Sequence, residues 1–147
     1  YSDMAVTVGV GRISDGVKKF LETGRRALSL GIKEVRAGNH IGDISAAIEK
    51  GLRDAGCGIV ESLAGHGIGR KLHEEPLVPN LGRKGSGPQL EEGMVIAIEP
   101  IYTNGSPEVY LARDGWTITS EKSTLAGHFE DTVAVTADGP IILTKPE

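Results

Sequence analysis

The amino-acid sequence predicts an α+β fold in which two helices are followed by a series of short, mainly antiparallel strands. Apolar residues recur at helical spacing over residues 15–35 and again over residues 42–55. After residue 58 the pattern changes to short segments of alternating apolar and polar residues, separated by glycine and proline. Helices that precede the strands, instead of alternating with them, are typical of the α+β class.

The first third of the chain is expected to hold one strand and both helices. Valines alternate with smaller residues over residues 5–11, which predicts a strand. A serine–aspartate pair at residues 14–15 suits the beginning of a helix that continues to about residue 35. The second helix covers residues 42–55 and is expected to end at Gly56.

The remainder of the chain is predicted to form short strands joined by loops. Residues 64–70 and 79–93 are rich in glycine or proline and are interpreted as loops. Asp138-Gly139 predicts a tight turn between the last two strands. The strands themselves are expected at residues 58–63, 94–102 with a break at Pro100, 109–111, 116–119, 129–136 and 141–143.

Length and composition favour a single cytoplasmic domain spanning residues 1–147. The net charge of −4 argues against a specific nucleic-acid partner, which requires a basic surface. No apolar run is long enough to cross a membrane, and residues 1–3 do not resemble a signal peptide. Cys57 is the one cysteine, so no internal disulfide forms and a reducing compartment is expected.

Four residues from distant parts of the chain are candidate ligands of a metal ion: Asp3, His66, Glu99 and Glu130. Three carboxylates and one imidazole suit a divalent cation of hard to borderline character. Each residue also has an ordinary explanation. A histidine between glycines is more often structural, and an aspartate near the start of a chain is usually solvated. Glu99 either emerges into solvent at a strand end or is paired, and Glu130 either protects an edge strand or faces the same site.

Other site classes fit the sequence less well. The glycine spacing over residues 65–69 differs from that of a dinucleotide fingerprint, and no glycine loop carries the phosphate-binding GK[ST] sequence. Residues 73–76 do not form the HExxH sequence of a zinc helix. A glycoside hydrolase that uses Glu99 and Glu130 is a further reading, but it leaves His66 and its glycines unexplained.

Several segments, taken in order, resemble the methionine aminopeptidases, which are members of the pita-bread metallopeptidases. The resemblance covers nearly the whole chain and implies a pita-bread fold of the α+β class that is incomplete at its N-terminus, because the family has a further half upstream. The matching segments are YSDMAVTVGVG, AGNHIGDISAAIE, GHGIGRKLHEEPLVPN, LEEGMVIAIEPIY, DGWTITS, HFEDTVAVT and DGPIILT.

The resemblance also implies a role for each candidate residue. Family members bind two divalent ions, such as Co, Mn, Fe or Zn, and the first aspartate of their ligand set lies upstream of YSD. Asp3, His66, Glu99 and Glu130 match the other ligands and would form one full set. His73 matches a histidine that binds the substrate and stabilises the tetrahedral intermediate.

The same resemblance extends to the remaining substrate-binding residues. Glu99 matches a carboxylate that shuttles a proton in addition to binding metal. Trp116 matches a residue that lines the side-chain pocket, and Leu72 occupies a pocket position that is often aromatic. Glu130 is followed by Asp131, where many relatives have histidine, and this pair is similar to the Xaa-Pro peptidases of the same fold.

The function implied is that of a metallo-aminopeptidase that removes N-terminal methionine when a metal-activated water attacks the first peptide bond. The implied partners are nascent polypeptide N-termini, with transient ribosome association. An exposed sheet edge near residues 5–11 predicts self-association. Two alternatives stay open: a prolidase-like Xaa-Pro peptidase of this fold, and a non-catalytic pita-bread binding module.

Overall fold

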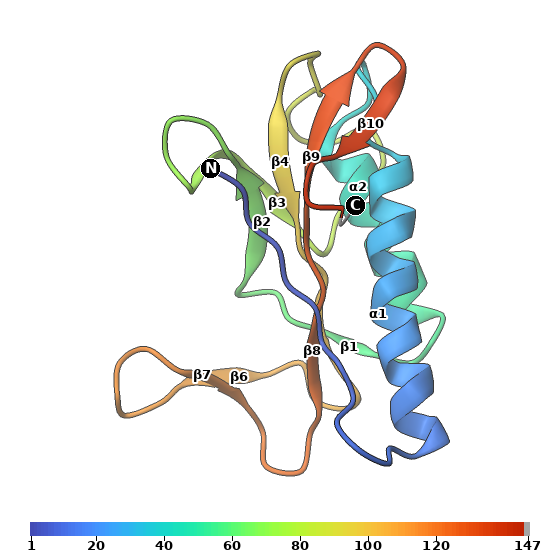
Figure 1. Cartoon of the computed structure of the whole chain (residues 1–147), viewed down its shortest axis with the longest axis vertical. Helices are drawn as coiled ribbons and strands as arrows, with labels where there is room; N and C mark the ends of the chain where they lie inside the picture. Colours follow the sequence, from blue (N-terminus) through green and yellow to red (C-terminus); the bar gives the residue numbers. More distant parts are fainter. Residues whose placement is uncertain (146–147) are drawn as a thin grey trace.

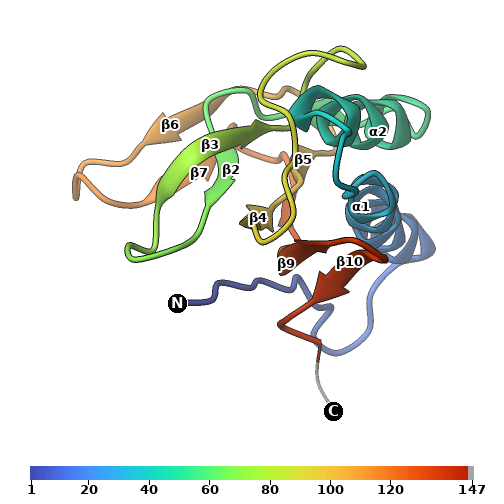
Figure 2. The same cartoon turned by 90° about the horizontal axis from the view of Figure 1, so that it is seen from above.

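The computed structural model describes residues 1–145 and confirms the α+β class. Two helices, α1 (Asp15–Lys33) and α2 (Ile41–Arg53), lie side by side on one side of the molecule, and the strands lie on the other (Figures 1 and 2). Both helices agree with the predicted spans to within two residues at each end. The Ser14 hydroxyl accepts a hydrogen bond from the backbone N–H of Val17 and so caps α1, as expected.

The central layer is a five-stranded antiparallel sheet in the order β10-β9-β4-β2-β3. Strand β4 lies in the middle, with β2 on one side and β9 on the other. The strands are β2 (Ala64–Gly67), β3 (Glu74–Pro79), β4 (Val95–Ile98), β9 (Asp131–Thr136) and β10 (Gly139–Ile142).

Two smaller antiparallel sheets extend the structure beyond this layer. A three-stranded sheet has the order β1-β5-β8, and a two-stranded hairpin of β6 and β7 projects away from the helices (Figure 1). The strands are β1 (Gly58–Ile59), β5 (Ile101–Thr103), β8 (Ala126–His128), β6 (Val109–Leu111) and β7 (Ile118–Ser120).

The core lies between the helices and the sheets. Tyr102 on β5 packs against Gly24 of α1, and its hydroxyl donates a hydrogen bond of 2.8 Å to the carbonyl of Phe20. A Cβ on Gly24 would lie 2.3 Å from that hydroxyl, so α1 requires glycine at this contact. The predicted apolar helix faces are buried as expected; the core residues include Leu21, Leu28, Ile32, Ile44, Ile48, Leu52, Ile96, Ile98 and Val133. None of the helices in residues 1–145 is long and apolar enough to cross a bilayer.

The sequence-based assignment was wrong in five segments, one of which is β8, a strand that was not predicted. Residues 5–11 do not form a strand; only Ala5 makes an isolated bridge, to Glu130. The expected strand over residues 58–63 is confined to β1, and residues 64–67 of the expected loop form β2. Strand β3 was not predicted. The Asp138-Gly139 turn is confirmed, with Gly139 at a φ of 114° where β9 turns into β10.

Candidate metal centre

Glu99 and Glu130 lie opposite each other at a break between two sheets. Ile98 pairs with Asp131 on one side of the break, and Ile101 pairs with His128 on the other. The register is the same on both sides, which places Glu99 across from Glu130. Pro100 has no N–H group to continue the ladder, so the chain passes there from the five-stranded sheet into the three-stranded one.

Two carboxylates in opposite positions of an antiparallel pair repel each other. Glu130 is buried, and Glu99 has a side-chain exposure of only 13%. Burial, followed by the nearby Glu99 and Asp3 carboxylates, raises the pKa of Glu130 to about 7. A cation bound between these side chains would relieve this repulsion, so the arrangement suits a metal centre.

His66 enters the centre from β2, on the other side of β4. Its Nδ1 lies 3.0 Å from the carbonyl oxygen of Gly67, and because a carbonyl can only accept, Nδ1 must carry the hydrogen. Nε2 then presents a lone pair toward Glu99 Oε1, which is 3.8 Å away. With Nδ1–H bonded to a backbone carbonyl, Nε2 is the ring atom available to a metal ion.

The glycines beside His66 are required by the neighbouring strands. A Cβ on Gly65 would lie 2.3 Å from the carbonyl oxygen of Ala97, and one on Gly67 would lie 2.2 Å from that of Glu75. Real Cβ atoms do not approach backbone oxygens this closely. The GHG sequence therefore brings β2 tightly between β3 and β4, and so fixes His66.

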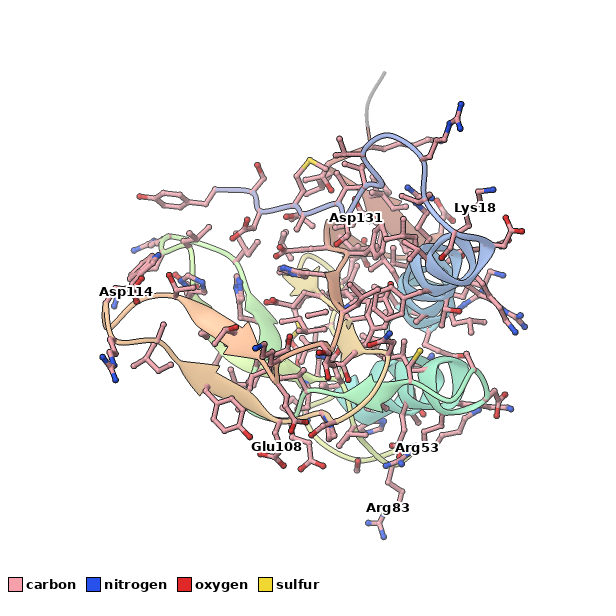
Figure 3. The ribbon with its side chains drawn as sticks, turned by 90° about the horizontal axis from the view of Figure 1, so that it is seen from below. Lys18, Arg53, Arg83, Glu108, Asp114 and Asp131 are labelled. Atoms are coloured by element: carbon pink, nitrogen blue, oxygen red, sulfur yellow. The ribbon has the colours of Figure 1, made fainter. Side chains whose placement is uncertain are left out.

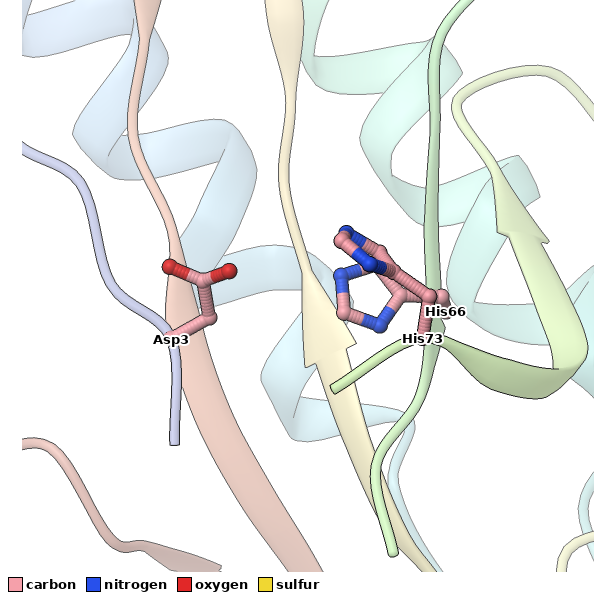
Figure 4. Close-up of side chains that lie close together, drawn as sticks. All are labelled: Asp3, His66 and His73. Atoms are coloured by element: carbon pink, nitrogen blue, oxygen red, sulfur yellow. The ribbon is translucent and has the colours of Figure 1, made fainter. Parts of the chain in front are cut away.

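The structure brings the sequence-predicted ligands together in two overlapping groups. Ligand atoms of His66, Glu99 and Glu130 all lie within 4.8 Å of one another. Those of Asp3, His66 and His73 form a second group by the same measure (Figure 4). His66 belongs to both groups, so the two groups adjoin each other at this residue. Imidazole nitrogen and carboxylate oxygen at such separations fit a divalent cation.

Asp3 reaches this volume from the N-terminal segment, which runs alongside β8 and β9 (Figure 1). Its backbone is bonded to the buried hydroxyl of Thr132. His73 comes from the turn between β2 and β3; its ring centroid lies 4.2 Å from that of His66, and its side chain is exposed. His73 is thus the imidazole of the pair that an incoming molecule can reach.

Two predicted substrate-binding residues lie outside both groups. Leu72 is partly buried in the turn before β3. Trp116 is 87% exposed in the turn of the β6–β7 hairpin, where Asp114 accepts hydrogen bonds from the backbone of Trp116 and Thr117. Figure 3 labels Asp114 at the tip of this hairpin. The structure orders this tip but does not place the indole against the ligand atoms.

His128 lies at this site but was not among the residues proposed from the sequence. Its Nε2 lies 3.3 Å from Glu99 Oε2 and 3.5 Å from Glu130 Oε2. Burial opposes the charged imidazole, but the two carboxylates outweigh it, so the pKa of His128 is raised. A signal was available: His128 precedes Glu130 by two residues, and such residues share one face of an extended chain.

Comparison with known proteins agrees with this geometry. Residues 1–137 match the model of metallopeptidase family M24. The chain is 44% identical over 144 residues to a methionine aminopeptidase of Clostridium perfringens, covering 98% of this chain and 58% of that protein.

Solved structures give the same picture. The crystal structure of the methionine aminopeptidase from Thermotoga maritima matches with a TM-score of 0.96 and 38% identity, over 99% of this chain and 59% of that one. The prolidase of Pyrococcus horikoshii matches with a TM-score of 0.74 and 26% identity, over 99% of this chain and 36% of that one. The pita-bread fold expected from the sequence is thereby confirmed, and the chain spans somewhat more than half the length of the methionine aminopeptidases. It belongs to metallopeptidase family M24.

Proposed function

We propose that residues 1–147 form the metal-binding catalytic domain of a methionyl aminopeptidase, which removes N-terminal methionine from nascent polypeptides. The observation that carries this proposal is the convergence of His66, Glu99 and Glu130 within 4.8 Å, with Asp3 beside them. The likeness to methionine aminopeptidases along nearly the whole chain supports the same reaction. A cytoplasmic location and transient ribosome association are expected of an enzyme that acts on nascent chains.

Asp3, His66, Glu99 and Glu130 would hold the ion. When bound, a divalent cation supplies the charge that polarises a peptide carbonyl and activates water. The chain contributes the fixed Nε2 lone pair of His66 and the buried carboxylate of Glu130. Glu99 is more accessible than Glu130, so it is the carboxylate suited to take up a proton and return it to the leaving amine.

His73 is proposed to bind the substrate. Its exposed ring lies next to His66 and can donate a hydrogen bond to an oxygen that becomes negative during the reaction. Leu72 and Trp116 are proposed to contact the methionine side chain. Both are apolar and at least partly accessible, which a side-chain pocket requires.

A prolidase-like activity on Xaa-Pro bonds is the second candidate. The Glu130-Asp131 sequence favours it. The identity of 38% and TM-score of 0.96 with a methionine aminopeptidase, against 26% and 0.74 with a prolidase, favour the methionine reaction.

The test is a peptide assay after loading with Mn²⁺ or Co²⁺, using Met-Ala-Ser and an Xaa-Pro peptide of equal length. We expect release of methionine from Met-Ala-Ser, no cleavage of the Xaa-Pro bond, and loss of activity on chelation. The His66→Ala variant is the matched negative control. Faster cleavage of the Xaa-Pro peptide would transfer the assignment to the prolidases. Metal binding without any cleavage would favour the non-catalytic binding module.

We also propose that two copies of this chain associate through the N-terminal segment. The side chains of Met4, Val6, Val8 and Val10 are all more than half exposed, although they are apolar. An extended segment with a row of exposed apolar side chains is a template for pairing with another chain.

A further inference from the structure

The carboxylate of Glu99 faces two different histidines. Its Oε1 lies 3.8 Å from Nε2 of His66, whereas its Oε2 lies 3.3 Å from Nε2 of His128. His128 also approaches Oε2 of Glu130, at 3.5 Å. The ring of His128 therefore approaches one oxygen of each glutamate, while the other oxygen of Glu99 faces His66. A carboxylate oxygen of Glu130 lies within 4.8 Å of the ligand atoms of His66 and Glu99.

The chemistry of this contact requires His128 Nε2 to be a donor. The atom is buried and, among the described residues, has no aligned hydrogen-bond partner. A lone pair directed at two carboxylate oxygens would be repelled by both, whereas an N–H group is attracted to both.

The backbone of His128 is held firmly on two sides. Its N–H donates a hydrogen bond of 2.9 Å to the Thr7 hydroxyl, which in turn donates one of 2.7 Å to the His128 carbonyl. On the other side, His128 pairs with Ile101, two residues after Glu99. The imidazole is thus attached to the same strands as the two carboxylates.

We propose that His128 is a positioning residue of the metal centre, whose Nε2–H holds the outer oxygens of Glu99 and Glu130 so that their inner oxygens face the ion. This inference rests on the proposed metal-dependent function. Residues that hydrogen-bond ligating carboxylates fix the orientation of the ligands, and their loss weakens metal binding without removing a ligand.

Calorimetric titration with Mn²⁺ tests this role in the full chain. We expect His128→Ala to weaken Mn²⁺ binding about 10–100-fold, the usual effect of losing such a contact. His128→Gln keeps an N–H donor and should recover most of the affinity. His128→Leu fills the space without a donor and repeats the test if the alanine variant does not fold. His40→Gln, at the start of α2, is the matched control and should bind Mn²⁺ normally.

The visible absorption spectrum of bound Co²⁺ supplies a second measurement, because it reports the ligand set. We expect His128→Gln to keep the wild-type spectrum. Unchanged Mn²⁺ affinity in a folded donor-free variant would overturn the inference and leave the metal centre standing. Equal loss of affinity in the glutamine and alanine variants, with an altered Co²⁺ spectrum, would also overturn it, because His128 would then be a ligand. Failure of the wild-type chain to bind Mn²⁺ would overturn the metal centre itself.

Discussion

The hydroxyl of Thr132 holds both backbone polar groups of Asp3. It accepts a hydrogen bond of 2.8 Å from the Asp3 N–H and donates one of 2.7 Å to the Asp3 carbonyl. Thr7, four residues after Asp3, holds the backbone of His128 in the same manner through its own hydroxyl. Between them, Ala5 and Glu130 exchange two backbone hydrogen bonds. Two threonine side chains thus replace most of the strand ladder and bring the Asp3 carboxylate to the candidate metal centre.

Thr132→Val should weaken metal binding without changing a ligand. Valine has the same shape but loses both hydrogen bonds to Asp3, so Asp3 is released together with the N-terminal segment. We expect a loss of about 1–2 kcal/mol in the free energy of unfolding and weaker Mn²⁺ binding by calorimetry. Thr136→Val, on the same strand, is the control: within residues 1–145 its hydroxyl bonds only the carbonyl of Gly139. Normal Mn²⁺ affinity in Thr132→Val would mean that Asp3 does not need this clamp.

The metal-free protein should lose stability as the pH rises from about 4.5 to about 7. The pKa of Glu130 is raised from 4.5 to about 7 in the folded state, so in this window the unfolded chain releases a proton that the folded chain retains. The loss approaches about 3 kcal/mol for a shift of this size. Glu130→Gln should remove this slope in urea denaturation measured with chelator present. A slope of the same size in both proteins would assign it to other groups.

His66 and His73 should differ in the effects of their removal. His66→Ala removes a ligand, so it should abolish tight binding of Mn²⁺. His73→Ala should leave Mn²⁺ affinity nearly normal and lower kcat by about 10²–10³-fold. Calorimetry and the Met-Ala-Ser assay separate the two effects. Loss of metal from His73→Ala would identify His73 as a ligand. This is the alternative to test because His73 lies beside Asp3 and His66.

Gly67→Ala should destabilise the fold and displace His66. The added methyl group would meet the carbonyl oxygen of Glu75 at 2.2 Å, and backbone on β3 cannot move away as a flexible side chain can. We expect a loss of about 1–3 kcal/mol in urea denaturation and weaker Mn²⁺ binding. Gly16→Ala in α1 is the control: its nearest contact would be 3.8 Å away, and alanine favours the helix. Equal stability of the two variants would contradict the close packing of β2 against β3.

Val8→Lys should convert associated copies of the chain into monomers. The Val8 side chain is exposed, and a charge on a segment that pairs with another chain opposes that pairing. Light scattering at several concentrations gives the mass of each protein. Lys18→Val, which changes an exposed residue of α1, should not alter association. A wild-type chain that is monomeric throughout would disprove association through this segment.

The sequence predicted those elements that depend on the spacing of nearby apolar residues or on turn residues. The spacing of Phe20, Leu28 and Ile32 was enough for α1, and Asp138-Gly139 was enough for the last hairpin. The GHG segment was read as a loop because glycine is usually unfavourable in strands. The reason for its glycines is the close approach of two carbonyl groups from other strands. The carbonyl of Glu75 on β3 lies across a turn, and that of Ala97 on β4 lies far away in the sequence.

The four candidate ligands were proposed from the sequence, whereas the residues around them were identified only in part. Asp3, His66, Glu99 and Glu130 each stand in a distinctive segment, and the structure brings them together. His128 could not be recognised with equal ease, because its role depends on the register that places Glu99 opposite Glu130. The valines at residues 5–11 suggested a strand, but threonine side chains make the contacts that backbone groups would otherwise have made.

The break at Pro100 separates the five-stranded sheet, which carries or adjoins most of the candidate metal ligands, from the part of the chain that projects beyond it. Strands β5 and β8 pair over three successive positions, from Ile101 opposite His128 to Thr103 opposite Ala126, and close the base of the β6–β7 excursion. Residues 104–125 can therefore be lengthened, shortened or replaced without shifting Glu99 against Glu130. Under the proposed function, changes in this excursion, which carries Trp116, would alter the peptides accepted while Glu99 and Glu130 keep their places.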